Sequence, residues 1–295
     1  MNSILFFLIL ALLKILAVLP FGLLYKISDL TYYIIRYVIR YRYDLVIGNL
    51  KRSFPEKSDI GKTANDFYRH LSDCIFETIK LLYISDKQLD EHIKVVGSDL
   101  IEKLAEDGRS IILFLGHYGN WEWVQAVIRH YSRPAINAEI YRPPKNQVMC
   151  RIIERVRSRF DTIAIPQDRA VRHLLKMHQD GMQFLVGFIS DQRPNSANLY
   201  HWTTFLNQDT AYPTGGEEIG SHLNAHFVYL SVEKICRGHY VMTFQEMQTD
   251  QYKEEKFPYT LRFLQLMEES IRKEPAYWLW SHNRWEFDRE GNVIH

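Results

Sequence analysis

The sequence predicts an α/β fold with a largely parallel central sheet flanked by helices, and an N-terminal membrane-anchoring helical segment. Short apolar runs such as 111–115 and 183–190 have the length and residue type of buried strands. Between residues 92 and 245 such runs alternate with helical segments, which is typical of sheets built from parallel strands. Residues 4–25 are apolar except for Lys14, which predicts the anchor.

Three regions follow from these patterns: residues 1–25 as a hydrophobic membrane anchor, 26–90 as an amphipathic helical region, and 91–295 as the α/β domain. The first region has three possible interpretations: a signal peptide, a spanning helix, or a membrane-embedded or interfacial hairpin. The start Met-Asn-Ser lacks a basic side chain and no Ala-x-Ala cleavage site follows, so we favour an uncleaved anchor and leave its depth open.

The stretch from Lys26 to Arg52 interleaves basic residues with tyrosines, a combination favoured at membrane interfaces. The positive-inside rule then places this stretch and the body of the protein on the cytoplasmic side. The alternative is an ordinary amphipathic helix packed on the domain with its basic residues in water.

The remaining elements are expected in a regular order. Helices are expected at 59–85, 98–106, 121–128, 146–160, 169–179 and 258–273, and strands at 92–97, 111–115, 133–138, 162–166, 183–190, 225–236 and 239–245. The last two strands should form a hairpin across Arg237-Gly238.

Composition limits the function. The chain has 295 residues, 36 basic and 35 acidic, so no global field argues for a nucleic-acid partner. Its three cysteines are far apart, which fits a reducing compartment and argues against a cysteine-rich metal site. His222 and His226 have metal-ligand spacing, but no third ligand motif accompanies them, and we expect no metal or cofactor.

The chemistry is expected in the turn that follows the strand 111–115. His117 lies in that turn and Glu122 follows in the first turn of the next helix, at the edge where open α/β sheets bind ligands. A carboxylate on one imidazole nitrogen leaves the other free to take a proton. We therefore expect His117 as general base, oriented by Glu122, in a reaction whose nucleophile is a hydroxyl of the substrate. A chance pairing with a solvated histidine is the alternative.

Four further residues are candidates for substrate binding. Asp191 and Gln192 end another buried strand and face the same edge, although a carboxylate that caps the next turn explains Asp191 equally well. Arg142 and Arg159 are candidates for an anionic group, because a guanidinium pairs with phosphate through two bonds. The alternative is that both are surface arginines.

The segment Gly-His-Tyr-Gly-Asn-Trp-Glu at 116–122 resembles the first signature block of the lysophospholipid acyltransferase superfamily, and more narrowly of the lipid A biosynthesis (late) acyltransferases. Similar blocks lie at 47–56, 141–144, 157–160, 191–192 and 274–285, so the resemblance covers most of residues 24–287. In the block at 204–216, Asn207 stands where the family has glycine, and asparagine tolerates the positive φ of such a turn. In the last block we expect a packing role for His282.

The resemblance implies a membrane-bound O-acyltransferase of class EC 2.3.1 that moves a fatty acyl chain from an acyl carrier protein thioester to a lipid A precursor. It implies the cytoplasmic face of the cell inner membrane as location. Two alternatives stay open: an acyltransferase that acts on a lysophospholipid, aminolipid or glycolipid, and a non-catalytic lipid-binding membrane protein. Donors to the oxyanion are expected from backbone N–H groups after Gly116 or from a nearby arginine.

Overall fold

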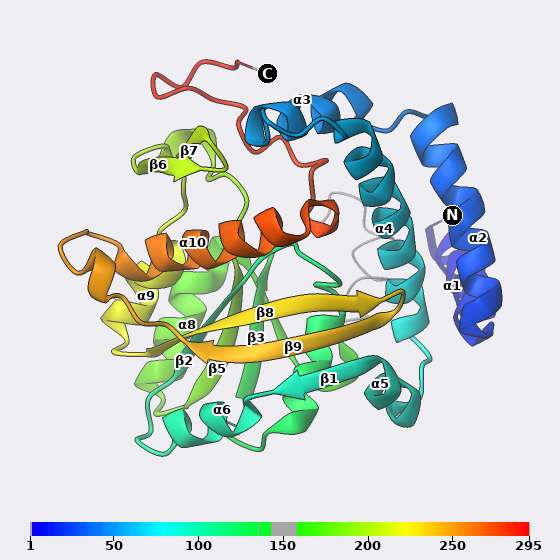
Figure 1. Ribbon diagram of the computed structural model, residues 1–295. Coiled ribbons are helices and arrows are strands. Elements are labelled where there is room, and N and C mark those ends of the chain that lie inside the picture. Colours follow the sequence, from blue (N-terminus) through cyan, green and yellow to red (C-terminus); the bar gives the residue numbers. More distant parts are fainter. Residues whose placement is uncertain (1, 135, 143–157, 295) are drawn as a thin grey trace.

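The structure is a computed structural model that describes residues 2–134, 136–142 and 158–294. Its centre is a seven-stranded sheet in the order β1-β9-β8-β2-β5-β3-β4 (Figure 1). The strands are β1 (Ile93–Val96), β2 (Ile111–Leu115), β3 (Ile136–Tyr141), β4 (Ile163–Pro166), β5 (Phe184–Ile189), β8 (His226–Cys236) and β9 (His239–Glu246). β2 runs parallel to β5 and β8, and β3 runs parallel to β4 and β5. The largely parallel sheet is thus confirmed, and β8 with β9 forms the expected antiparallel hairpin.

The central strand β2 is buried on both faces, which explains its unbroken apolar sequence. Phe114 faces α10 (Pro258–Lys273), where its ring stacks on Phe263 with centroids 5.4 Å apart. Leu113 and Leu115 point to the opposite face and belong to a second core with Trp123. Because side chains alternate along a strand, β2 joins the two hydrophobic cores of the domain.

Helices cover both faces of the sheet. The α-helices of the domain are α5 (Asp86–His92), α6 (Ser98–Ala105), α8 (Ala170–Gln179), α9 (Gly215–His222) and α10, and the 3₁₀ helices are η2 (Trp123–His130), η3 (Ser158–Phe160), η4 (Gln167–Arg169), η5 (Ser196–Asn198), η6 (Asp250–Tyr252) and η7 (Pro275–Tyr277). The helix expected at 121–128 is therefore a 3₁₀ helix that begins two residues later, where the Asn120 side chain accepts a hydrogen bond from the Trp123 N–H at 3.2 Å. Most of the helix expected at 146–160 lies outside the described residues.

The N-terminal region is helical and lies beside the sheet. It contains α1 (Asn2–Val18), α2 (Phe21–Tyr33), the π-helix η1 (Ile34–Val38), α3 (Tyr43–Ser53) and the long α4 (Ile60–Leu81). In Figure 1, α4 stands between the sheet and the first two helices. Its inner side buries Phe67 and Tyr68, so it connects the N-terminal region to the core of the domain.

Large apolar side chains are exposed on these first helices. Phe7, Ile15 and Val38 are 63%, 60% and 77% exposed, although water disfavours such side chains. The apolar stretch at 4–25 is divided at Pro20 into α1 and α2. Among the described residues, no helix has both the length and the hydropathy that a membrane span needs.

A small hairpin of β6 (Trp202–Phe205) and β7 (Gln208–Ala211) lies outside the main sheet. Its turn is formed by Leu206 and Asn207, with φ values of 50° and 61°. Asparagine adopts this left-handed conformation more readily than most residues, so the turn forms with Asn207 at this position, as expected.

Candidate active site

His117 lies in a tight turn at the carboxyl end of β2. Two glycines shape this turn. A side chain at Gly116 would place its Cβ 2.6 Å from the Met267 sulfur, and Gly119 has φ +60° with Val232 only 2.7 Å from such a Cβ. A side chain at Gly116 would require Met267 to move, and one at Gly119 would also strain the backbone, so glycine lets the turn pass close to α10 and β8.

The His117 ring is held by Asp191, which follows the neighbouring parallel strand β5. The ring nitrogen Nδ1 lies 2.8 Å from one carboxylate oxygen, and the backbone N–H of His117 donates to the other at 3.0 Å. The indole N–H of Trp278 donates to that second oxygen at 2.7 Å. The carboxylate is 1% exposed, whereas the His117 side chain is 18% exposed and reaches the surface of the site.

The electrostatics of this pair fix which nitrogen can act as a base. Burial opposes ionisation of Asp191, but the His117 ring and the N–H donors outweigh it and lower the pKa of the carboxyl to about 2. An ionised carboxylate only accepts hydrogen bonds, so Nδ1 carries the proton. The Gln192 amide nitrogen lies 3.2 Å from Nε2 and donates to it. Nε2 is therefore the ring nitrogen that is free of a proton and able to accept one.

Asp191, rather than Glu122, occupies the position on Nδ1 that the sequence assigned to an orienting carboxylate. The ends of β2 and β5 adjoin in the sheet, which brings Asp191 against His117. Glu122 follows the Gly119 bend, where it is half-buried at the start of η2. Asp191 and Gln192, expected as substrate ligands, thus contact the His117 ring itself.

The C-terminal segment completes the turn around His117. The N–H of Leu279 donates to the His117 carbonyl at 3.1 Å, and the N–H of Gly119 donates to the Tyr277 carbonyl at 3.0 Å. The N–H of Tyr118 donates to Gly116 at 2.8 Å. The backbone N–H groups of 117–119 are therefore already used within the protein. They do not form the oxyanion site that the sequence offered as one alternative.

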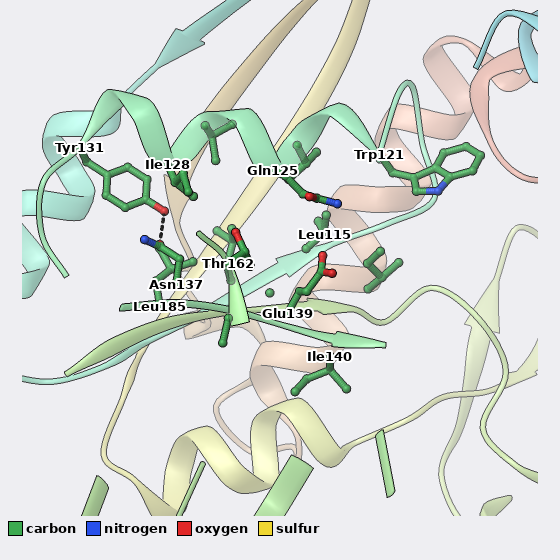
Figure 2. A pocket seen from close by; sticks show the side chains of 16 residues that line it. Leu115, Trp121, Gln125, Ile128, Tyr131, Asn137, Glu139, Ile140, Thr162 and Leu185 are labelled. Carbon is green, nitrogen blue, oxygen red and sulfur yellow. Dashed lines mark hydrogen bonds between the residues drawn. The ribbon is translucent and has the colours of Figure 1, made fainter. Parts of the chain in front are cut away.

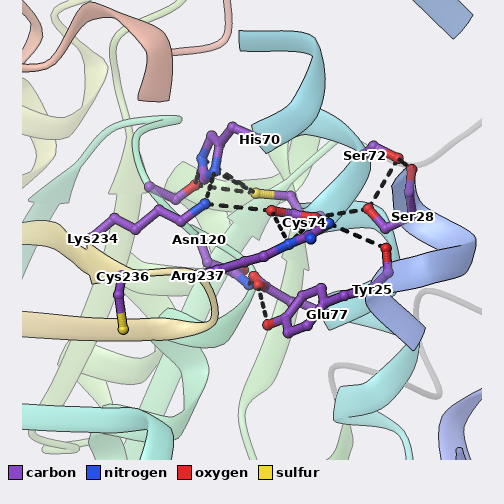
Figure 3. A network of polar contacts seen from close by, with 12 residues as sticks. Tyr25, Ser28, His70, Ser72, Cys74, Glu77, Asn120, Lys234, Cys236 and Arg237 are labelled. Carbon is purple, nitrogen blue, oxygen red and sulfur yellow. Dashed lines mark hydrogen bonds and ion pairs between the residues drawn. The ribbon is translucent and has the colours of Figure 1, made fainter. Parts of the chain in front are cut away.

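A buried polar network supports the turn from behind (Figure 3). Glu77 in α4 accepts hydrogen bonds from Asn120 at 2.7 Å, from Tyr240 at 2.7 Å and from Tyr25 at 2.9 Å. Burial raises the pKa of this carboxyl. One side chain thus connects the turn after His117 to β9 and to the N-terminal helix α2.

Of the two arginines expected to bind an anion, Arg159 makes its described contacts within the protein. Arg159 donates to the carbonyls of Leu81 and Ile84 and to the carboxylate of Asp86, at 3.2 Å for the last. Its guanidinium therefore caps the end of α4, a structural role. Arg142 follows β3 and is exposed.

An apolar cavity lies between η2 and the strands β2, β3 and β5 (Figure 2). The space inside it and at its open mouth together amounts to about 590 Å³. Trp121 lines it near His117, with ring centroids 5.4 Å apart, and Tyr131 lines it too. The other apolar lining residues are Leu113, Leu115, Val124, Val127, Ile128, Ala138, Ile140, Leu185, Gly187 and Ile189.

Two residues of the closing block, the buried Arg284 and the half-buried His282, were not expected to lie near Asp191. Arg284 is 2% exposed, and burial lowers its pKa to about 9. The nearby His282 is also shielded, and burial lowers its pKa to about 4, so its ring is neutral at physiological pH. Asp191 acts electrostatically on both residues. The spacing of this block indicated aromatic packing, whereas the fold places its charged residues beside the His117–Asp191 pair.

Three comparisons relate this chain to known proteins. A solved structure of a 1-acyl-sn-glycerophosphate acyltransferase from Thermotoga maritima is 17% identical, with a TM-score of 0.36 over 84% of this chain and 97% of that one. No curated protein gives a significant sequence match. The family model described as bacterial lipid A biosynthesis acyltransferase matches residues 1–286. The chain therefore belongs to the bacterial lipid A biosynthesis acyltransferase family, and it is an acyltransferase of class EC 2.3.1 that acts on lipid.

Proposed function

We propose that this protein transfers a fatty acyl chain from an acyl carrier protein thioester to a hydroxyl of a lipid A precursor, with His117 as general base. The observation that carries the proposal is the His117–Asp191 pair, whose histidine ring packs against Trp121, a residue that lines an apolar cavity. The family supplies the substrate class, and the cavity supplies a place for the hydrocarbon chain.

The reaction needs no nucleophile from the protein. Nε2 of His117 removes the proton of the acceptor hydroxyl while its oxygen attacks the thioester carbonyl. The Asp191 carboxylate stabilises the imidazolium that forms, as the acid of a catalytic triad does. When the tetrahedral intermediate collapses, the carbon–sulfur bond breaks and the imidazolium returns the proton to the leaving thiolate. The products are an ester and a free thiol.

Gln192 is suited to stabilise the oxyanion. Its amide lies beside Nε2, where the acceptor hydroxyl must approach, so substrate binding displaces it from the ring. The freed N–H groups then face the reacting carbonyl. A side-chain donor fits this site because the nearby backbone N–H groups of 117–119 are already engaged.

We also propose that the enzyme acts at the cytoplasmic face of the inner membrane. The exposed apolar side chains of α1, α2 and η1 support contact with a lipid surface. Arg36 lies among them, with its guanidinium 4.1 Å from the centre of the Tyr43 ring, and such basic and aromatic residues suit the headgroup region. These helices would lie in the interface and bring the acceptor lipid to the site.

The test uses purified protein, a defined acyl-carrier thioester and a lipid A precursor, with mass spectrometry of the product. His117→Ala should reduce turnover about 100- to 10,000-fold, the usual contribution of a general base. His178→Ala serves as the control, since that histidine lies in α8. Near-normal turnover by folded His117→Ala, or accumulation of an acyl-enzyme, would contradict direct attack by the acceptor.

A further inference from the structure

A second pocket near the His117–Asp191 pair contains a buried guanidinium that has no partner in the part of the chain that the structure describes. All three nitrogens of Arg284 lack a hydrogen-bond partner there, and so does Nε of Arg193. Arg284 is 2% exposed, so water does not replace the missing partners. Burying an unpaired cation is costly, and proteins ordinarily avoid it by pairing the charge. The arrangement therefore indicates a site for an anion.

The hollow in front of Arg284 has a volume of about 200 Å³ including its opening, and is also lined by Arg193, Asp209 and Trp285. The neighbouring acidic groups are already engaged. Asp209 accepts hydrogen bonds from Arg289 at 2.6 and 2.8 Å, and Glu286 is paired with Arg193. These two carboxylates are thus neutralised by other arginines. Asp191 acts electrostatically on Arg284, but its hydrogen bonds come from His117 and Trp278, so the N–H groups of Arg284 are left for a ligand.

The segment that leaves β5 connects this hollow to the reaction site. Ile189 lines the apolar cavity, Asp191 bonds to His117, and Arg193 lines the hollow of Arg284. Every second residue of one short segment thus contacts, in turn, the apolar cavity, His117 and the hollow of Arg284. A substrate group in this hollow would lie near the reacting atoms.

The number and geometry of the donors indicate the ligand. Arg284 and Arg193 together offer four unpartnered nitrogens, and a guanidinium binds oxyanions through a planar fork. A carboxylate has only two oxygens, whereas a phosphate monoester has three terminal oxygens. We propose that Arg284 and Arg193 form a basic pocket that binds a phosphate group of one of the two substrates. This inference rests on the proposed acyl transfer only for the identity of those substrates.

A binding measurement tests the pocket without turnover. Inorganic phosphate should raise the melting temperature of the wild-type protein above that seen in sodium chloride of equal ionic strength. Arg284→Met should fold, because replacing an unpaired buried cation with an apolar side chain is neutral or stabilising, and it should lose this phosphate-specific shift. Arg169→Met, which changes an arginine that is 76% exposed, is the control and should keep the shift.

Kinetics then identify which substrate carries the phosphate. Arg284→Lys keeps the charge but loses the fork, and should raise one KM roughly 10- to 100-fold. If the KM for the acceptor rises, and this rise disappears when the acceptor is dephosphorylated, the pocket holds the acceptor's headgroup. If instead the KM for the carrier-protein thioester rises, the pocket holds the phosphorylated arm of the donor.

Two results would overturn the pocket: an equal phosphate shift in wild-type protein and Arg284→Met, or unchanged KM values for both substrates in Arg284→Lys. If Arg284→Met does not fold, the same phosphate titration of Arg284→Lys decides, and an undiminished shift counts against the pocket. Absence of acyl transfer from every donor, with the phosphate shift intact, would refute the proposed function and leave the pocket standing.

Discussion

The Asp191 carboxylate accepts hydrogen bonds from two atoms of His117, the ring nitrogen Nδ1 at 2.8 Å and the backbone nitrogen at 3.0 Å. One side chain thus fixes both the orientation of the ring and the path of the turn that carries it. Since the first bond also selects the tautomer, Asp191 controls whether Nε2 can take a proton.

Asp191→Asn should therefore cost far more activity than Glu122→Gln. An amide that donates to Nδ1 favours the wrong tautomer, and the loss in kcat should be on the order of 100- to 10,000-fold. Glu122→Gln should stay within roughly tenfold of the wild-type protein, because Asp191 holds the ring. Steady-state kinetics of the two folded variants check this. The reverse ranking would restore Glu122 as the orienting carboxylate.

The same carboxylate predicts how stability depends on pH. Its pKa is about 2 in the folded protein against an ordinary 3.8, so its contribution is present above pH 3.8 and is lost as the pH falls through about 2. The contribution is on the order of 2 kcal/mol. Urea unfolding between pH 2 and 5 should show a steeper fall for the wild-type protein than for Asp191→Asn. Parallel curves would mean that Asp191 has an ordinary pKa.

Trp278→Phe isolates the third donor to Asp191. It keeps an aromatic ring but removes the N–H that lies 2.7 Å from the carboxylate. We expect kcat to fall roughly tenfold with KM unchanged, since one hydrogen bond to a charged group is lost. Trp280→Phe is the matched control, because its buried N–H donates to the Pro275 carbonyl instead. Equal kinetics in the two variants would show that the Trp278 bond only supports packing.

Arg159→Ala should affect stability rather than substrate binding. Its guanidinium donates to the carbonyls of Leu81 and Ile84 at the end of α4, and leaving them unpaired should lower the free energy of unfolding by about 1–3 kcal/mol. The KM for the acceptor should not change. Denaturant unfolding and kinetics check both parts, with the exposed Arg169→Ala as control. A raised acceptor KM in a fully stable variant would return Arg159 to the site.

The sequence predicted most of the fold because local patterns determine it. The apolar run 111–115 can only be buried on both faces, and the hairpin of β8 and β9 followed from two strands joined at Arg237-Gly238. The exact start of η2 was missed, since Asn120 caps a 3₁₀ turn as readily as an α-helix.

The site was less predictable because its contacts join distant parts of the chain. His117 and Asp191 were both placed at the correct edge, but their pairing depends on β5 lying next to β2. Glu122 was chosen because it is near in sequence. Arg284 carried no sign of its burial, since a guanidinium near the end of a chain is ordinarily exposed, and only the packed structure shows its surroundings.

The contacts of residues 275–285 with the His117 turn have a consequence for biosynthesis. The chain is made from its N-terminus, so the helices with exposed apolar side chains leave the ribosome long before Trp278 and Leu279, which hold Asp191 and His117. Asn49 in α3 likewise donates a hydrogen bond to the carbonyl of Trp280, at 3.1 Å, and this bond cannot form until residue 280 has been synthesised. The His117 turn can therefore be completed only after residues 275–285 have left the ribosome, long after the N-terminal helices.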